Sequence, residues 1–266
     1  MDLGLAGQQA VVVGGAQGIG RAIADQFRTS LSNVSIWDIH PAVDDAPSEA
    51  ATEQLGGLRF RRADVTAEET LVAGFADLAA STTGPLHVVY AAGAGSGKFG
   101  FPFWNLQPDD WPRVLDINLT GAVRAAQAAA PLLTERGGTL LFISSIAGQI
   151  GSQTDPPYSA AKAGLINFAQ CAAKDLAAFD VRVNTICPGM IKTTLNRAVW
   201  EAWSRQAGLD AVGYDEWAGE KVRQVAPLGR WQEPQDIGAL AAFLASPLAK
   251  NITGQTLNVD GGQVMQ

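Results

Sequence analysis

Residues 10–21 read Ala-Val-Val-Val-Gly-Gly-Ala-Gln-Gly-Ile-Gly-Arg, an apolar run that leads into a glycine-rich turn and then a helical pattern. An apolar run without alternation is typical of a strand covered on both faces, as in a parallel sheet. Gly14, Gly18 and Gly20 let the backbone turn tightly, and the start of the next helix offers free N–H groups and a positive dipole. A strand, glycine turn and helix in this order therefore favour binding of a pyrophosphate group.

The rest of the chain repeats the alternation of strand and helix. Further apolar runs cover residues 34–37, 86–90, 139–143, 181–186 and 256–259, and helical spacing appears in 21–30, 68–80, 109–133, 157–179 and 234–245. Strands that alternate with helices predict right-handed crossovers and a doubly wound parallel sheet with helices on both faces. We expect an α/β fold in a single domain over residues 1–266, since no low-complexity linker divides the chain.

One segment, residues 194–226, breaks the alternation. It carries Trp200, Trp203, Tyr214 and Trp217 among charged residues. Ligands of α/β sheets bind beyond the carboxyl ends of the strands, and this segment follows a predicted strand end. We therefore expect a small helical lid over a substrate pocket, the alternative being a helical pair packed on the surface.

The composition excludes several classes of partner. The chain has 266 residues, 47% of them hydrophobic, with a formal net charge of −7. The acidic excess repels phosphate backbones, so we expect no nucleic-acid partner, and no stretch approaches the ~18 apolar residues that span a membrane. Two cysteines and the lack of a basic leader favour a cytoplasmic location, with Cys171 and Cys187 as small core residues. Two histidines and two cysteines far apart also predict no metal site.

Asp38 follows the second apolar run, where it would stand beside the glycine turn. A carboxylate at this position accepts the ribose hydroxyls of adenosine and repels a 2′-phosphate. Neither position 17 nor position 39 carries a Lys or Arg to hold such a phosphate. The sequence therefore favours NAD over NADP.

Tyr158 and Lys162 open a predicted helix with i, i+4 spacing, which places the phenol and the ammonium on one face. A nearby cation favours the phenolate, so we expect Lys162 to lower the pKa of Tyr158 and make it a general acid or base. Ser145 follows the strand at 139–143 and can hydrogen-bond the same substrate oxygen.

These features together resemble the short-chain dehydrogenase/reductase superfamily over about residues 5–262. The matching motifs are the glycine motif at 13–20, Asp64 in Ala-Asp-Val, Asn118 in Ile-Asn-Leu-Thr-Gly, the Tyr158/Lys162 pair, Pro-Gly-Met-Ile-Lys-Thr at 188–193 and Asn-Val-Asp-Gly-Gly at 258–262. The family's serine-to-tyrosine spacing selects Ser145 rather than Ser144. The resemblance implies a Rossmann fold of about seven strands.

The resemblance also implies roles for individual residues. Tyr158 would be the acid/base, Lys162 would hold the nicotinamide ribose, Ser145 would orient the substrate oxygen, and Asn118 would hold a water that links Lys162 to solvent. The implied cofactor contacts are Gly14, Gln17, Gly18, Ile19, Gly20, Asp38, Asp64, Val65, Ala92, Gly93, Tyr158, Lys162, Pro188, Gly189, Ile191 and Thr193. Candidate substrate contacts are Ser145, Gln149, Ser152, Tyr158, Trp200 and Trp203, with Trp104 and Gln153 as further candidates.

The chain departs from the family pattern at three places. Val13 replaces a threonine, Ala91 replaces an asparagine that braces the sheet, and His87 replaces an acid. These departures bear on cofactor affinity and local stability and leave all four catalytic positions intact. We expect His87 and His40 to be structural or exposed rather than catalytic.

The leading hypothesis is an NAD-dependent oxidoreductase that interconverts a secondary alcohol of polyol, sugar or diol type and its carbonyl. One alternative is a 3-ketoacyl-thioester reductase of fatty-acid metabolism, and another is a non-catalytic NAD-binding scaffold. The resemblance further implies a homotetramer that pairs the helices near 109–133 and 157–179 and the C-terminal strands.

Overall fold

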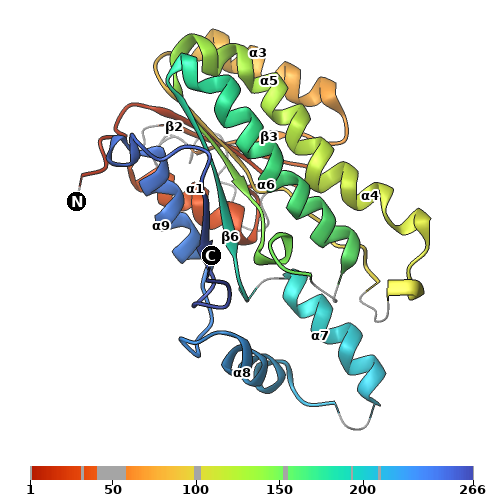
Figure 1. The fold of residues 1–266 in the computed structure, drawn as a ribbon. Coiled ribbons are helices and arrows are strands. Elements are labelled where there is room, and N and C mark those ends of the chain that lie inside the picture. Colours follow the sequence, from red (N-terminus) through yellow and green to blue (C-terminus); the bar gives the residue numbers. More distant parts are fainter. Residues whose placement is uncertain are drawn as a thin grey trace.

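The computed structural model describes residues 2–30, 33–40, 58–98, 103–151, 155–192, 194–208 and 211–265. In these residues the chain forms one seven-stranded parallel sheet with the order β3-β2-β1-β4-β5-β6-β7 (Figure 1). The strands are β1 (Gln9–Val13), β2 (Asn33–Asp38), β3 (Leu58–Arg62), β4 (Leu86–Tyr90), β5 (Gly138–Ile143), β6 (Val181–Pro188) and β7 (Thr256–Val259). The predicted α/β Rossmann-type fold is confirmed.

The strand β3 is the one that the apolar pattern did not predict. It lies at the edge of the sheet and pairs only with β2, and it carries Arg59, Arg61 and Arg62. An edge strand does not need a continuous apolar run, because less of its surface is enclosed than that of a central strand. The central strand β1, in contrast, is buried along its whole length.

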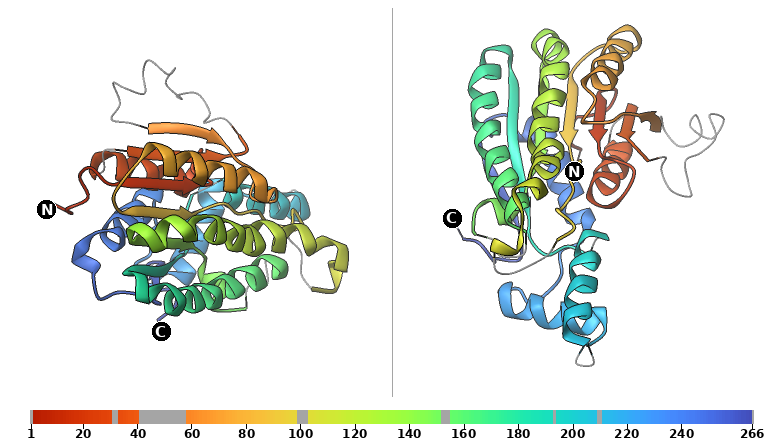
Figure 2. Two further views of the ribbon diagram at one scale, coloured as in Figure 1. Left: turned by 90° about the horizontal axis from the view of Figure 1, so that it is seen from above. Right: turned by 90° about the vertical axis from the view of Figure 1, so that its right-hand side faces the viewer.

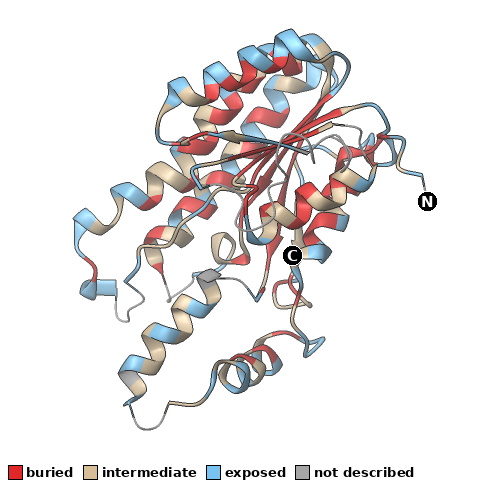
Figure 3. Cartoon of the chain, turned by 180° about the vertical axis from the view of Figure 1, so that it is seen from behind, coloured by how far each residue is buried: buried red, intermediate tan, exposed pale blue. Residues whose placement is uncertain are grey.

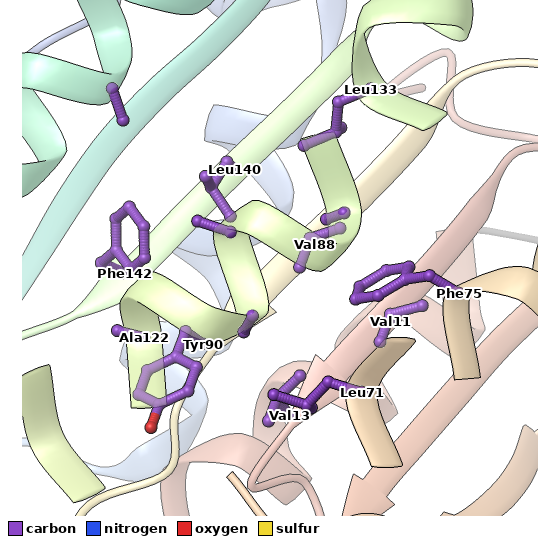
Figure 4. Packing of buried hydrophobic residues seen from close by; sticks show 14 of the residues in the cluster. Val11, Val13, Leu71, Phe75, Val88, Tyr90, Ala122, Leu133, Leu140 and Phe142 are labelled. Atoms are coloured by element: carbon purple, nitrogen blue, oxygen red, sulfur yellow. The ribbon is translucent and has the colours of Figure 1, made fainter. Parts of the chain in front are cut away.

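Helices cover both faces of the sheet. They are α1 (Gly18–Ser30), α3 (Glu68–Ser81), α4 (Pro112–Leu115), α5 (Gly121–Arg136), α6 (Pro156–Leu176), α7 (Thr194–Ala207), α8 (Tyr214–Val225) and α9 (Pro234–Ala245). Val11 and Val13 of β1 point into one hydrophobic cluster with α3, α5 and α6 (Figure 4), and Ala10 and Val12 point into a second with α1 and α9. The period of two along a strand thus supplies both cores from the same apolar run.

The predicted helix at 109–133 is not a single helix. It consists of a 3-10 turn at Pro108–Asp110, the short helix α4, a π-helical turn at Asp116–Thr120, and α5. A π-turn widens the backbone locally and is frequent at functional sites. The expected asparagine, Asn118, lies inside this turn.

The helices α7 and α8 project away from the sheet, beyond the carboxyl ends of its strands (Figures 1 and 2). Few of their residues are fully buried, whereas the central strands β1, β4, β5 and β6 are buried almost throughout (Figure 3). The expected lid segment is therefore helical, with the helices at 194–207 and 214–225. No helix in the described ranges is long and apolar enough to cross a membrane.

Candidate active site

The glycine turn follows β1 at the point where the strand order reverses between β1 and β4. Gly14 has a φ of +81°, and a Cβ there would lie 2.4 Å from the backbone nitrogen of Ala92. A Cβ at Gly20 would lie 2.1 Å from the carbonyl oxygen of Gly14. Side chains at these two positions are therefore excluded, and the tip of the turn, Gln17 and Gly18, remains exposed at the start of α1.

Asp38 lies directly beside this turn. Its Oδ2 accepts a hydrogen bond from the Ala16 backbone N–H at 3.1 Å, and its Oδ1 accepts one from the His40 N–H at 3.1 Å. Asp64 lies beyond the end of β3, where its Oδ1 accepts hydrogen bonds from Thr66, and these bonds hold the pKa of Asp64 below its usual value. The two carboxylates expected to contact adenosine thus lie at the carboxyl ends of neighbouring strands, Asp38 as the last residue of β2 and Asp64 just beyond β3.

Tyr158 and Lys162 lie in the first two turns of α6. The Nζ of Lys162 is 5.4 Å from the centroid of the Tyr158 ring and donates a hydrogen bond to the Ile143 carbonyl at 2.8 Å. A side-chain hydrogen bond joins Ser145 to Tyr158. Ser144 instead donates to the Lys162 carbonyl at 2.9 Å and is buried. The structure therefore brings Ser145, and not Ser144, to the tyrosine hydroxyl.

The pKa of Tyr158 differs from the expectation that Lys162 lowers it. Loss of solvation around the phenol raises the pKa of Tyr158 to about 12, and the hydrogen bond from Ser145 opposes this rise. The same loss of solvation lowers the pKa of Lys162 to about 8. Burial is the largest cause of both shifts, because it penalises the charged form of each group. In this state the phenol is protonated at neutral pH, and the ammonium titrates close to neutrality.

Asn118 is fully buried and reaches the same centre from the π-turn. Its Nδ2 donates to the carbonyls of Ala94, at 2.7 Å, and Val114, at 2.8 Å, and its Oδ1 has no partner in the described residues. A Cβ at Gly93 would lie 2.9 Å from this Oδ1 and 3.5 Å from the Nζ of Lys162. The free amide oxygen and the ammonium therefore face the same bare stretch of backbone.

The Pro188–Gly189 turn ends β6 on the other side of the centre. The Gly189 N–H donates to the Val259 carbonyl at 2.9 Å, and a Cβ at Gly189 would lie 2.7 Å from the Cα of Asp260. Ile191, two residues further on, is buried. Thr193 lies outside the described residues, so the contact expected for it has no structural description.

The candidate substrate residues do not form one group. Gln149 donates to the Asn258 Oδ1 at 2.8 Å, while Ser152 and Gln153 lie outside the described residues. Trp200 packs edge-to-face on Tyr214 at 5.7 Å, and Trp203 lies 6.0 Å from Trp217. These tryptophans therefore join α7 to α8.

Trp104, a further candidate for the substrate pocket, is 68% exposed beside Phe103. The described residues thus give it a neighbouring aromatic ring but little cover from solvent.

Two further buried groups lie at this centre, of which Asp155 has no part in the sequence-based expectations and Cys187 was expected only as a small core residue. Asp155, immediately before α6, accepts a hydrogen bond from the Ser96 N–H at 2.8 Å, and burial raises its pKa. Cys187 is buried, as expected for a core residue, and lies beside Ser144 and Ser145. Burial raises the pKa of its thiol to about 11, and the Ser144 side chain and the Ser145 backbone hydrogen-bond it. Nothing in the sequence context of Asp155 marks it, because tertiary contacts alone bring it here. The other cysteine, Cys171, is exposed, so its expected core position was wrong.

These residues fit a nicotinamide dinucleotide. A side chain at Gly14 or Gly20 would collide with backbone, the start of α1 is open beside the Asp38 carboxylate, and the buried Oδ1 of Asn118 is free. A tight glycine turn at a helix N-terminus suits a pyrophosphate, and the crevice at the reversal of strand order is where doubly wound sheets bind such ligands. The tyrosine, lysine and serine lie along the same carboxyl edge of the sheet.

Comparisons with known proteins find a family match and relatives over nearly the whole chain. A family model described as enoyl-(acyl carrier protein) reductase matches residues 14–263. The 3-oxoacyl-[acyl-carrier-protein] reductase FabG of Chlamydia pneumoniae is 32% identical, over 98% of this chain and 99% of that protein. The cis-4-hydroxycyclohexanecarboxylate dehydrogenase of Sinomonas cyclohexanicum is 36% identical over 95% of each chain. The structure of L-sorbose reductase from Gluconobacter frateurii, complexed with NADPH and L-sorbose, has a TM-score of 0.87 and 25% identity over 100% of both chains.

The chain belongs to the short-chain dehydrogenase/reductase superfamily. It is an oxidoreductase that acts on an alcohol or the corresponding carbonyl, and a nicotinamide dinucleotide is the cofactor typical of this family.

Proposed function

We propose that this protein is an NAD-dependent dehydrogenase of secondary alcohols, with polyols, sugars or vicinal diols as the substrate class. The observation that carries the proposal is the cluster at the carboxyl edge of the sheet, where Ser145 hydrogen-bonds Tyr158 and Lys162 lies 5.4 Å from the tyrosine ring. A polar cluster in which Lys162 is buried and Tyr158 and Ser145 are partly buried, beside a glycine turn that fits a dinucleotide, is suited to positioning and proton transfer.

Tyr158 acts as the acid/base on the substrate oxygen, and Ser145 donates a hydrogen bond that orients that oxygen. Lys162, whose pKa is lowered to about 8 by burial, is able to exchange a proton near neutral pH. Asn118 presents its free Oδ1 toward the same space and completes the path from Lys162 to solvent. When bound, the nicotinamide supplies or accepts the hydride, and the protein contributes placement and proton handling.

The dinucleotide is held by the glycine turn 14–20, and NAD is selected by Asp38. Support for this choice comes from the position of the carboxylate, which adjoins the turn through the Ala16 N–H. A carboxylate there repels a 2′-phosphate. Asp64 and Val65 contact the adenine, and Ala92 and Gly93 line the floor of the dinucleotide site. The nicotinamide carboxamide is held by Pro188, Gly189, Ile191 and Thr193.

The substrate class rests on a comparison of folds. The L-sorbose reductase fold match extends over the whole chain, which supports a hydroxylated substrate under a lid made of residues 194–226. The second candidate is a 3-ketoacyl-thioester reductase, and the 32% identity to FabG favours it. Asp38 opposes this second candidate because its carboxylate disfavours NADPH. The net charge of −7 also opposes it, because it disfavours an acidic carrier protein.

One absorbance screen separates these functions. The purified protein is assayed at 340 nm with NAD and NADP in parallel, against polyols, aldoses, diols and hydroxy acids, and in reverse with acetoacetyl thioesters. Turnover of a polyol, sugar or diol with NAD is the expected result. Faster thioester reduction with NADPH would support the second candidate, and silence with every compound would favour a non-catalytic scaffold.

We also propose a homotetramer, in which α5, α6 and the C-terminal strands meet their counterparts. Both helices are rich in alanine, which permits close helix packing. Sedimentation equilibrium tests this assembly, and a monomer at micromolar concentration would contradict it.

A further inference from the structure

The orientation of Asn118 depends on a distorted piece of helix. The segment Asp116–Thr120 forms a π-turn, in which the Gly121 N–H donates to the Asp116 carbonyl five residues earlier. A π-turn disturbs the regular ladder of backbone hydrogen bonds, so its carbonyls need other partners when they are buried. The groups that donate hydrogen bonds to these carbonyls therefore determine the direction of the Asn118 side chain.

Tyr90, the last residue of β4, supplies one of them. Its hydroxyl donates a hydrogen bond to the carbonyl of Ile117, the residue before Asn118. The Tyr90 side chain is fully buried beside Ala122 (Figure 4), and burial raises the pKa of its phenol, so it remains a donor. The bond therefore joins a central strand of the sheet to the π-turn.

The space for this hydroxyl is provided by a glycine. A Cβ at Gly121 would lie 2.6 Å from the Tyr90 Oη and 3.0 Å from the Cβ of Val65. Any side chain at this position would therefore displace the hydroxyl or the backbone that it holds. Gly121 and Tyr90 form one matched pair.

The segment after β4 holds the π-turn at a second point. The carbonyl of Ala94, four residues beyond Tyr90, accepts a hydrogen bond from the Asn118 Nδ2 at 2.7 Å. Tyr90 thus fixes the backbone before Asn118, and Ala94 fixes its amide nitrogen. With both contacts in place, the Oδ1 of Asn118 faces Gly93 and the Nζ of Lys162.

We infer that Tyr90 is a positioning residue for the proton path through Asn118 and Lys162, an inference that rests on the function proposed above. Its hydroxyl keeps the π-turn in the geometry that directs the Asn118 Oδ1 toward Lys162. Tyr90 touches neither substrate nor cofactor in this role, and it acts through the Ile117 carbonyl. It provides a brace next to the position where the family's asparagine is replaced by Ala91.

The test compares Tyr90→Phe with a matched control, Ser35→Ala. Tyr90→Phe removes one hydroxyl and leaves the Ile117 carbonyl unpaired. Ser35→Ala removes the buried acceptor of the Trp37 indole N–H, at 2.7 Å, on the opposite side of β1 from β4. We expect both variants to lower the melting temperature. Only Tyr90→Phe should also lower kcat, by about tenfold, because a misplaced proton path slows the reaction while the binding groups stay in place. We expect KM and the dinucleotide Kd to stay within about twofold of wild type.

The pH profile provides a readout that a purely structural role would not change. Tyr90→Phe shifts the kcat profile in the region where Lys162 titrates, whose pKa is about 8, while Ser35→Ala leaves the profile unchanged. If Tyr90→Phe is too unstable to purify, Gly121→Ala replaces it, since it keeps the hydroxyl but occupies its space. The same loss of kcat is expected for that variant.

A double-mutant cycle with Asn118→Ala decides whether Tyr90 acts through Asn118. In that background the Tyr90→Phe change should cost little further kcat, because the group that it positions is gone. Equal losses in both backgrounds, or a Tyr90→Phe variant that behaves like Ser35→Ala, would overturn the inference and leave the proposed function standing. An Asn118→Ala variant with wild-type kcat would instead refute the proposed proton path itself, and the inference with it.

Discussion

In the body of the molecule, formed by the sheet and the helices that cover it, buried polar side chains such as Lys162 and Asn118 bond to backbone carbonyls, whereas the aromatic side chains of α7 and α8 are half-exposed and pack on one another. Lys162 is 3% exposed and bonded to the Ile143 carbonyl, and Asn118 is fully buried with two carbonyl acceptors. The ring centroids of Trp203 and Trp217, in contrast, lie 6.0 Å apart, and both side chains are partly exposed to solvent.

The difference follows from the cost of burying polar groups. A buried donor or acceptor without a partner is expensive, so the body of the sheet permits few arrangements of its polar side chains. Aromatic contacts between two projecting helices tolerate small shifts, because dispersion and quadrupole contacts are less directional. We therefore assign chemistry to the body and substrate choice to the α7–α8 pair, and four measurements test that division.

The largest effect is expected for Tyr158→Phe. Loss of the phenolic proton should lower kcat by about 10³-fold, since a positioned acid/base contributes roughly 10²–10⁴. Dinucleotide binding, measured by quenching of protein fluorescence, should stay within about twofold because the ring remains. A variant that retains more than about a tenth of wild-type kcat would contradict the acid/base role.

His87 tests the buried polar groups through the pH dependence of stability. It is buried between Thr139 and Gln8, with Arg182 as the nearby charge, and burial lowers its pKa to about 4 from 6.5. In this range the unfolded chain therefore binds a proton that the folded chain does not bind. As pH drops from about 6.5 to about 4, the free energy of unfolding falls by on the order of 3 kcal/mol. Urea unfolding at pH 7 and pH 4.5 measures this loss.

His87→Gln should weaken that pH dependence, because the variant has no imidazole to protonate. The exposed His40 offers a matched control, and His40→Gln should keep the wild-type slope. Identical slopes for His87→Gln and wild type would show that the buried imidazole does not titrate as described.

Asp38→Ala tests the selection of the dinucleotide beside the glycine turn. Removal of a charged hydrogen-bond acceptor should weaken the binding of NAD by about 10- to 100-fold and leave the affinity for NADP nearly unchanged. Titrations of both dinucleotides, with Asp25→Ala of the half-buried acid on α1 as control, measure the ratio of the two affinities. Equal losses for NAD and NADP would mean that Asp38 supports the glycine turn through Ala16 without selecting the cofactor.

The smallest effect is expected for Trp203→Ala, which removes one contact between α7 and α8. Loss of an aromatic pair should loosen the two helices by about 1 kcal/mol, so their amides should exchange faster while those of β1 and β4 do not change. We expect KM to rise several-fold and kcat to stay within about twofold. Phe179→Ala, on an exposed surface elsewhere, serves as control, and a comparable fall in kcat for Trp203→Ala would place this helix pair within the chemistry.

Much of the fold follows from local sequence. The runs at 86–90 and 256–259 and the helical pattern at 234–245 match the strands and helix of the structure, because buried strands and amphipathic helices impose their own periods. The edge strand at 58–62 was missed because three of its five residues are arginines. The π-turn at 116–120 was also missed, since the contacts that support it, with the Tyr90 hydroxyl and the Ala94 carbonyl, come from residues distant in sequence.

The sequence by itself determined the class of fold, the glycine turn and the order of the motifs, because these depend on short-range spacing along one chain. Only the tertiary structure decided that burial raises the pKa of Tyr158, that Asp155 lies beside Ser96, and that Trp203 packs on α8. These outcomes depend on which groups are enclosed together and how far water is excluded, and solvation and long-range packing have no signature in local sequence.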